Sequence, residues 1–490
     1  MKHLSALDAT FLHLETLDMP MHVGALHLLD LPAGLKGEYI DALKRHIQKR
    51  MHLAAVFGKK LVFMPLDIAN PVWVDAGDVD LDYHIGQVSL PAPGTQLQLE
   101  TCVARLHAGL LDRSRPLWEF YLIGGLKSGQ VALYVKIHHA ALDGQGAGVL
   151  AQALLDVTAA PRRVRAPPPR EGAPHQVSAP GMLKAALRDT YDQCAKLVRG
   201  VPTGVRAAAG MLAPGADGRR RLGWPVRLAL APRTPFNVSI TSRRAYATVA
   251  LDLKQALALG KTYGGTLNDV VLCIVSGALR RYLDQHGALP DEPLVAAVPV
   301  SLRAEGDTQM NNQVSMMLMK LATDQADPVL RMHAIVKASA QMKKTVAGVK
   351  SVLPIDCPSL GLPWLLSVLV SLYARARLAD ALPPVANVIV SNVPGPRVAM
   401  YLAGARVTSN FPLSIVTHGL ALNVTVQSYD GALNVGLLAC RRALPDIGLF
   451  AACMAHSHQE LLAAGEPGAP KKRATASKTA PRKARVAKAA

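Results

Sequence analysis

The sequence predicts an α/β protein of two domains, and three observations indicate this class. Apolar strand-like runs alternate with amphipathic helical segments in both halves of the chain, a pattern typical of α/β folds. The length of 490 residues is too great for one hydrophobic core. A proline-rich stretch that begins at Pro161 interrupts the alternation, because proline removes a backbone donor and restricts its neighbours. We therefore expect two domains joined by a linker.

Each half supplies strand and helix candidates in turn. In the first half, Val131–Ile137 is an apolar strand candidate, and the segment QGAGVLAQALLDVT after Gly144 predicts a helix. The second half begins near Pro235 and continues the alternation. The expected strands there are Tyr246–Leu251, Leu294–Val300, Asn387–Val390, Leu420–Val426 and Leu433–Leu438, and the expected helices are Asn268–Tyr282 and Val329–Lys344.

These patterns set the expected boundaries. We assign residues 1–160 to a first domain, 161–234 to the linker, 235–462 to a second domain and 463–490 to a tail. Within the linker, Met182–Arg199 places apolar residues at helical spacing with basic residues interspersed. Packing on a domain is the expected use of this helix, and contact with anionic lipid is the alternative.

Composition favours large cores without a membrane span. Half of the residues are hydrophobic, and the mean hydropathy is +0.19. The longest uncharged stretch, Cys357–Ala374, is interrupted by Pro358, Gly361 and Pro363, so we expect a buried or surface-bound helix instead of a bilayer-crossing one. The start of the chain lacks the apolar run of a signal peptide. The six cysteines lack CxxC spacing, which fits the reducing cytoplasm.

Two consecutive histidines end the strand candidate of the first half. Successive side chains of a strand point to opposite faces, so His138 and His139 are not expected to enter the same cavity. Two histidines followed by a single aspartate offer no usual metal-ligand spacing, and we expect no metal. A histidine near neutrality is the usual side chain for taking a proton from a hydroxyl or thiol. We expect one histidine to act as the base and the other to support it.

The string HHAALDG, residues 138–144, matches the HHxxxDG motif of acyl-CoA-dependent acyltransferases. That superfamily includes chloramphenicol acetyltransferase, carnitine acyltransferases and the condensation domains of peptide synthetases. Other segments make the chain resemble the bacterial wax ester synthase/diacylglycerol acyltransferase family, and they occur in the family's order. They are LSALDATFLHLE (Leu4–Glu15), PMHVG (Pro20–Gly24), LDRSRPLWE (Leu111–Glu119), TLNDVVL (Thr266–Leu272), PVSLR (Pro299–Arg303), NNQVS (Asn311–Ser315) and SNVPGP (Ser391–Pro396).

The resemblance implies a fold and roles for particular residues. It implies two chloramphenicol-acetyltransferase-like domains with mixed sheets and an active-site tunnel between them, with His139 as general base and His138 as its support. Pro116, Leu117 and Trp118 match the family's PLW motif, as structural or tunnel-lining residues. Ser391, Asn392 and Gly395 belong to a loop near the family's channel.

Two polar residues keep a local reading beside the family one. Asp143 can cap the helix that follows it, whereas the resemblance implies a structural ion pair that fixes the histidine loop, with Arg303 as candidate partner. Asn268 matches the family's Asn-Asp pair and can donate to an oxyanion at a helix N-terminus, while Thr266 and Asp269 predict a capping box. A dinucleotide site at DGQGAG is rejected, because Val149 occupies the third fingerprint position and no acidic residue follows at the required distance.

The expected function is that of an acyl-CoA-dependent O-acyltransferase that esterifies diacylglycerol, a long-chain alcohol, or both. Acyl-CoA is a co-substrate, so no resident cofactor is expected. A condensation-type enzyme acting on a carrier-protein thioester and an acyltransferase for polyketide alcohols remain alternatives. A non-enzymatic coat protein of lipid inclusions is the alternative of a different class. We expect peripheral association with the inner membrane or with lipid inclusions.

The tail carries much of the positive charge of the chain. Residues 471–490 contain eight lysines and arginines and no acidic residue, out of a formal net charge of +19. Such a segment cannot bury a core and is expected to be disordered. A solvated tail is one reading, and attraction to anionic phospholipid is the other. Nucleic acid is an unlikely partner, because the tail has no aromatic residue to stack on bases.

Overall fold

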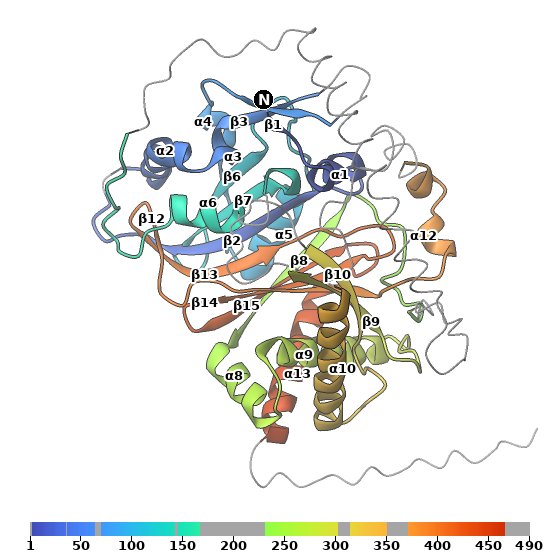
Figure 1. Cartoon of the computed structure of the whole chain (residues 1–490). Helices are drawn as coiled ribbons and strands as arrows, with labels where there is room; N and C mark the ends of the chain where they lie inside the picture. Colours follow the sequence, from blue (N-terminus) through green and yellow to red (C-terminus); the bar gives the residue numbers. More distant parts are fainter. Residues whose placement is uncertain are drawn as a thin grey trace, which may run out of the picture.

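The computed structural model describes residues 2–35, 37–63, 70–142, 146–166, 231–301, 314–349 and 371–465. Several sequence predictions lie outside these residues. They concern Asp143, Arg303, the linker helix Met182–Arg199, most of Cys357–Ala374 and the basic tail. The described residues form an α/β structure built on two six-stranded mixed sheets and one small three-stranded sheet, which confirms the predicted fold class (Figure 1).

The first large sheet carries the histidine pair. Its strand order is β12-β13-β2-β7-β6-β5, with only β5 and β6 running parallel. Helices α1, α2, α5 and α6 lie around this sheet (Figure 1). The strands are β2 (His22–Asp30), β5 (Ile85–Ser89), β6 (Trp118–Gly124), β7 (Val131–His138), β12 (Tyr401–Leu402) and β13 (Ala405–Leu413), and the helices are α1 (Ala6–Leu14), α2 (Tyr39–Arg50), α5 (Gln96–Ala108) and α6 (Gly146–Leu154).

Short elements complete the first domain. A three-stranded sheet of order β1-β4-β3 lies near the N-terminus. The remaining pieces are single turns that connect the longer elements. These elements are β1 (Lys2–His3), β3 (Lys59–Val62), β4 (Val72–Asp75), α3 (Ala55–Gly58), α4 (Leu81–His84) and the 3-10 turns η1 (Met51–Leu53) and η3 (His139–Ala141).

The second large sheet has the order β10-β9-β11-β14-β15-β8, with β11 parallel to both of its neighbours. Every strand and helix predicted for this half is present, most of them with wider bounds than predicted. The elements are β8 (Arg244–Asp252), β9 (Val295–Ser301), β10 (Val314–Lys320), β11 (Val388–Val393), β14 (Leu422–Tyr429), β15 (Ala432–Cys440), α8 (Leu253–Thr262), α9 (Leu267–Gln285), α10 (Pro328–Val349), α12 (Leu378–Ala381) and α13 (Ile447–Gly465).

One feature departs from the linear boundaries that the sequence predicts. Strands β12 and β13 belong to the predicted second domain, residues 235–462, yet they pair within the first sheet. Strand β13 runs antiparallel to β2, with Asn410 opposite His27. The pairing partners are separated by hundreds of residues, so no local pattern could reveal this exchange. The first domain is therefore completed by a segment from the far end of the chain.

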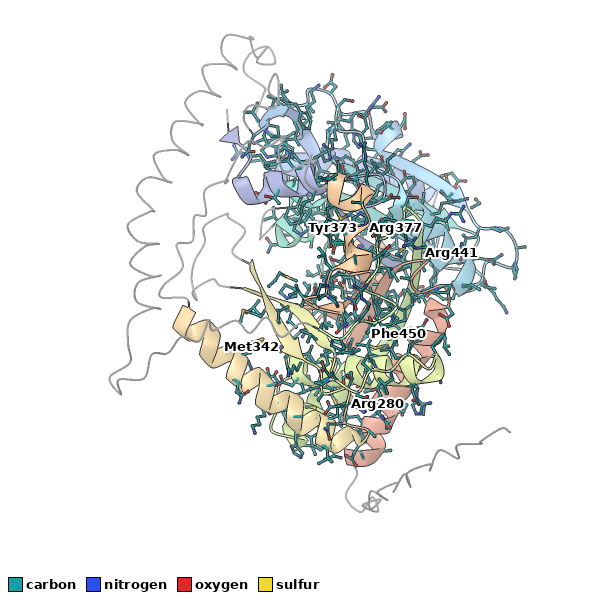
Figure 2. All side chains as sticks on the ribbon, turned by 90° about the vertical axis from the view of Figure 1, so that its right-hand side faces the viewer. Arg280, Met342, Tyr373, Arg377, Arg441 and Phe450 are labelled. Carbon is teal, nitrogen blue, oxygen red and sulfur yellow. The ribbon has the colours of Figure 1, made fainter. Side chains whose placement is uncertain are left out.

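The second sheet packs differently on its two faces. Alternate residues of β15 point to opposite sides, so Leu437 and Ala439 join the core beneath helices α8, α9 and α13. Leu438 and Cys440 instead join a core shared with Phe411 of β13 and with helix α5. Figure 2 views the molecule from the side that carries α12 and labels Arg280 of α9, Met342 of α10 and Phe450 of α13 among its side chains. The first domain and the helices thus cover opposite faces of one sheet.

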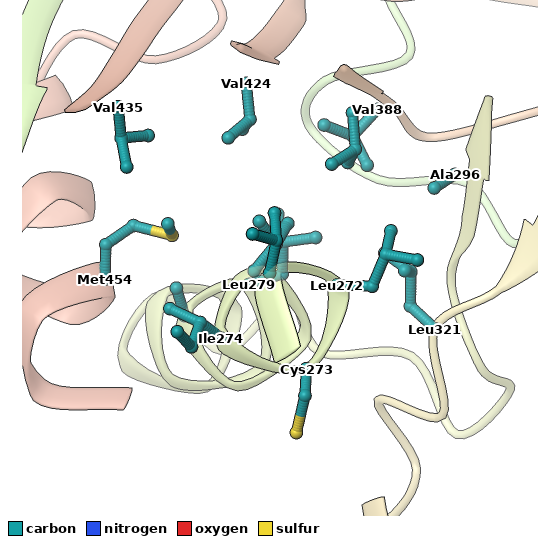
Figure 3. Packing of buried hydrophobic residues seen from close by; sticks show 14 of the residues in the cluster. Leu272, Cys273, Ile274, Leu279, Ala296, Leu321, Val388, Val424, Val435 and Met454 are labelled. Carbon is teal, nitrogen blue, oxygen red and sulfur yellow. The ribbon is translucent and has the colours of Figure 1, made fainter. Parts of the chain in front are cut away.

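Helix α9 forms the centre of the helical layer. Its residues Leu272 and Leu279 lie beneath Val388 and Val424 of the sheet, whereas Cys273 points to the other side of the helix (Figure 3). Within the residues that the structure describes, no helix combines the length and the apolar character that crossing a bilayer requires.

A buried ion pair anchors the end of the first domain to α2. Arg50 lies 2.9 Å from Asp156, and the two side chains are 2% and 3% exposed. Asp156 also exchanges backbone hydrogen bonds with Tyr401 of β12, at the point where the second half of the chain joins the first sheet. Two buried charges far from water are tolerated because each neutralises the other.

Removing one member of this pair should destabilise the protein strongly. Asp156→Ala strands the Arg50 guanidinium in the core, and we expect a loss of about 3–5 kcal/mol of unfolding free energy. The exposed pair Lys44–Asp82 provides the control, since Asp82→Ala should cost at most about 1 kcal/mol. Urea unfolding followed by circular dichroism measures both. Equal midpoints for the two variants would contradict this account of the ion pair.

Candidate functional site

The histidine pair lies where strand β7 ends. β7 pairs with β2 so that His138 stands opposite His22, and the 3-10 turn η3 begins at His139. The backbone N–H of His138 donates to the carbonyl of Leu117 at 3.0 Å. The strand therefore stops at a fixed position, and the two imidazoles leave it in different surroundings.

His138 is fully buried and contacts polar groups on both sides of its ring. Its Nε2 lies 3.2 Å from Glu15 Oε2, and its Nδ1 accepts the backbone N–H of Ala140 at 3.1 Å. An Nδ1 that accepts a hydrogen bond cannot carry a proton, so the ring proton resides on Nε2 and faces the carboxylate. This arrangement fits the supporting role expected for His138.

Glu15 is the charged centre of a buried cluster. Arg113 Nη2 donates to Glu15 Oε1 at 2.8 Å and to the Leu12 carbonyl at the same distance, and the N–H of Met21 donates to Glu15 Oε2 at 3.1 Å. Burial by itself would raise the pKa of Glu15, but contact with His138 and the charge of Arg113 outweigh it and lower the pKa to about 2. The carboxylate is therefore ionised throughout the neutral range.

His139 is fixed by its backbone and by a ring contact. Its N–H donates to the Met21 carbonyl at 2.9 Å. Its imidazole stacks on the ring of Phe11 in α1, with centroids 3.8 Å apart and planes 17° apart. Burial lowers the pKa of His139 to about 4, its own backbone carbonyl opposes this shift, and neighbouring His138 adds to it. His139 is therefore neutral at pH 7 and able to accept a proton.

A second polar layer lies under the pair, between the sheet and α5. Lys136 on β7 is 2% exposed and lies 2.7 Å from Glu119 on β6. His107 at the end of α5 shares a hydrogen bond of 2.6 Å with the Tyr134 hydroxyl. Burial lowers the pKa of His22 well below its ordinary value, with His107 adding to the shift. These contacts hold α5 against the strand that carries the histidines.

The structure places the PLW residues beside the pair as support. The Leu117 carbonyl receives the His138 N–H, as noted above, and the Pro116 carbonyl receives the N–H of Trp118 at 2.9 Å. The Trp118 side chain is fully buried in the core beneath α2 and stacks on His84. The Trp118 ring therefore lies in the core of the first domain, and the role of the motif stays a prediction.

The other predicted site residues lie in the second domain. Asn268 is half-buried in the first turn of α9, within the helical layer, where Thr266 donates to Asp269 as the predicted capping box requires. Ser391 and Asn392 end β11, and the Gly395 N–H donates to the Ser428 hydroxyl at 3.1 Å. A Cβ at Gly395 would lie 2.1 Å from the Ser428 carbonyl, so only glycine fits. Among the described hydrogen bonds, none joins these residues to either histidine.

Sequence reasoning did not assign roles to Glu15, Arg113 or Phe11. All three lie in segments that support the family resemblance, but their mutual contact spans about a hundred positions of the chain. A charged residue at the end of the apolar helix α1 was the available signal for Glu15. The predicted pair of Asp143 with Arg303 lies outside the described residues and stays a prediction.

Comparison with known proteins agrees with the fold. Residues 4–271 match the model of the wax ester synthase/diacylglycerol acyltransferase catalytic domain, and residues 310–462 match that of the WS/DGAT C-terminal domain. A Mycobacterium tuberculosis protein named provisionally as a diacylglycerol O-acyltransferase is 37% identical over 446 residues, which cover 91% of this chain and 96% of that protein. Another from the same species is 35% identical over 460 residues, covering 93% and 97% of the two chains.

Two solved structures are similar over nearly the whole chain. The wax ester synthase/diacylglycerol acyltransferase from Marinobacter aquaeolei VT8 has a TM-score of 0.66 and 30% identity, and the match covers 95% of this chain and all of that one. The first condensation domain of the CDA synthetase has a TM-score of 0.52 at 14% identity and covers 96% and 97% of the two chains, so it shows the fold alone.

These findings define an acyltransferase of the chloramphenicol-acetyltransferase-like fold. The chain belongs to the wax ester synthase/diacylglycerol acyltransferase family, as the resemblance in the sequence predicts.

Buried histidines should make the protein sensitive to mild acid. Burial lowers the pKa of His27 and His139 to about 4 and of His107 to about 3, whereas unfolded histidine titrates near about 6.5. The unfolded chain therefore binds more protons than the folded one between these values. The contribution of these neutral histidines to the free energy of unfolding is complete above about pH 6.5 and is lost as the pH falls toward about 4. The loss reaches about 2 kcal/mol per histidine at about pH 5.

Thermal melts followed by circular dichroism between about pH 7.5 and about pH 5 test this expectation, since most carboxylates titrate lower. The melting temperature should fall across this range. His27→Leu removes one of the three groups, so its melting temperature should fall less than that of the wild type. Parallel curves for the two proteins would show that His27 does not titrate as its burial demands.

Proposed function

We propose that this enzyme transfers the acyl group of an acyl-CoA to the hydroxyl of diacylglycerol or of a long-chain alcohol, with His139 as general base. The single observation that carries the proposal is the state of His139. It is a buried imidazole with a pKa lowered to about 4, anchored by its backbone to Met21 and by its ring to Phe11. Such a group is neutral and oriented, which a general base requires.

The position of His139 supports the following course for the proposed acyl transfer. His139 Nδ1 is buried, which leaves Nε2 as the atom to accept the hydroxyl proton of the acyl acceptor. The acceptor oxygen attacks the thioester carbonyl, and the carbon–sulfur bond breaks as the tetrahedral oxyanion collapses. The histidinium then returns its proton to the departing coenzyme A sulfur. An ester and free coenzyme A result, without a covalent acyl-enzyme.

The oxyanion requires a donor that the histidines do not supply. Asn268 is the residue that the family motif offers for this purpose, and its role stays a prediction. The same holds for Ser391, Asn392 and Gly395 near the proposed channel, and for Asp143 as the residue that fixes the histidine loop.

A thiol-release assay tests the proposed function. Palmitoyl-CoA is supplied with hexadecanol, with dipalmitoylglycerol or without an acceptor, and the products are separated by chromatography. Acceptor-dependent release of coenzyme A with formation of the ester supports the proposal. Transfer from a carrier-protein thioester but not from palmitoyl-CoA would favour the condensation-type alternative, and no ester with any acceptor would favour the coat-protein alternative.

The two histidines should respond differently to truncation. His139→Ala should lower kcat by about 100-fold to 10,000-fold, the usual contribution of a general base. His138→Ala should reduce activity partly, because its neighbour then loses orientation. His286→Ala is the matched control, since this half-exposed histidine pairs with Asp446 in the second domain. The same assay measures all three, and equal residual activity in His138→Ala and His139→Ala would refute the assignment.

We also propose that the enzyme works at an anionic lipid surface. A set of exposed side chains around α12, here called the α12 surface, supports this. Leu372, Leu378 and Leu382 are 59%, 37% and 50% exposed, and the exposed Arg375 and Arg377 lie between the first two in the sequence. Exposed leucines beside arginines suit the boundary between headgroups and acyl chains. The basic tail, outside the described residues, would add long-range attraction.

Changes on the α12 surface should weaken lipid binding without changing the chemistry. Leu372→Glu combined with Leu382→Glu should reduce co-sedimentation with phosphatidylglycerol vesicles, and Leu257→Glu, on the exposed side of α8, is the control. Deleting residues 466–490 should lower binding mainly at low salt, where charge attraction is least screened. Turnover of detergent-dispersed substrate should stay unchanged in every variant. Unaltered vesicle binding in both the double variant and the deletion would exclude this surface.

A further inference from the structure

We infer that Glu15 is a positioning residue that holds the proposed base in place through two separate arms, one through His138 and one through Met21. The inference rests on the proposed role of His139 as the base. It adds a residue outside the HHxxxDG string, and it assigns a purpose to a buried charge that would otherwise be costly to keep.

The first arm runs through the neighbouring imidazole. Glu15 Oε2 lies 3.2 Å from His138 Nε2, on the opposite side of the ring from the Nδ1 that accepts the Ala140 N–H. The carboxylate thereby favours the Nε2-protonated tautomer and keeps Nδ1 free to accept. Since Ala140 lies in the turn that starts at His139, the tautomer of His138 fixes the shape of that turn.

The second arm runs through the backbone of Met21. The Met21 N–H donates to Glu15 Oε2 at 3.1 Å, and the Met21 carbonyl accepts the His139 N–H at 2.9 Å. One carboxylate oxygen therefore restrains the residue that binds His139 from outside the turn. The first arm ends at the Ala140 N–H and the second at the His139 N–H, so together they restrain two successive residues of the turn.

Arg113 keeps the carboxylate charged and fixes where it sits. Two guanidinium nitrogens donate to Glu15 Oε1 at 2.8 and 3.1 Å, leaving Oε2 for the two arms. The same guanidinium donates to the Leu12 carbonyl, which ties it to α1. Glu15 is the residue that follows the end of α1, so the cluster also places Phe11, whose ring stacks on His139.

A buried carboxylate with a purely structural role needs only a charged partner. Asp156 shows such a role, since its buried carboxylate pairs with Arg50 and has no described contact with the histidine motif. Glu15 has the same kind of arginine partner but also reaches both neighbours of the base. Misplacing a reacting group by about one ångström can lower the rate about 100-fold. We expect a loss of up to this size when the contacts of Glu15 are removed.

The test compares Glu15→Gln, His138→Ala and their double variant with the wild type, and uses Asp156→Asn as the matched control. Glutamine keeps the shape of Glu15 and removes its charge. We expect Glu15→Gln to lower kcat about 10-fold to 100-fold while KM for palmitoyl-CoA stays within about twofold of the wild type. Asp156→Asn should lower the melting temperature and leave kcat of the folded protein near that of the wild type.

Coupling and hydrogen exchange separate positioning from mere stability. If Glu15 acts partly through His138, the loss in the double variant should be clearly smaller than the product of the two single losses. Amide exchange, measured by mass spectrometry on the peptide that contains His139 and Ala140, should speed up in Glu15→Gln and stay unchanged in Asp156→Asn. Losses that multiply, or unchanged exchange in Glu15→Gln, would overturn the inference.

The exchange measurement does not depend on turnover. If the wild type transfers no acyl group, the proposed function fails, and the exchange data still decide whether Glu15 holds the turn.

Discussion

Strand β2 fixes the relation between the two halves of the chain and the position of the histidine pair. It pairs on one side with β7, setting His138 opposite His22, and on the other side with β13 from the far half of the chain. The backbone hydrogen bonds of a central strand must be satisfied on both edges. Without β13 the sheet would have an open edge at β2, so the second half of the chain completes the sheet that carries the histidine pair.

The two titratable groups of the site differ in charge, because burial is opposed by ionic contacts at Glu15 but not at His139. His139 loses its proton because desolvation disfavours the cation, while Glu15 keeps its charge because Arg113 and His138 lie against it. The carboxylate of Glu15 lies against His138 and not against the His139 ring, so it bears on His139 only through His138 and the backbone. The low pKa makes His139 a weak base, so in the proposed reaction orientation would matter as much as basicity.

Local patterns in the sequence predict most of the elements and the identity of the candidate base. The apolar run of β7, the capped start of α9 and the HHxxxDG string are all short-range signals, and the structure confirms the first two as elements. The strand exchange of β13 and the contact of Arg113 with Glu15 are long-range, and nothing in the neighbourhood of either residue specifies them. The sequence could therefore suggest that His138 orients His139, but it could not reveal that Glu15 and Arg113 lie behind His138.

The residues that hold the proposed base lie in the first domain, so the side chains of the second domain can diverge without disturbing them. The described contacts of His139 include the ring of Phe11 in α1, the Met21 carbonyl and Leu142 in its own turn, while Arg113 contacts Glu15. The second domain contributes β13 to the first sheet but no described contact to the imidazole. A condensation domain of only 14% identity keeps the same fold over nearly its whole length. If the proposed base is held by the first domain, we expect the side chains of the second domain to vary more freely, as in other folds that serve several functions.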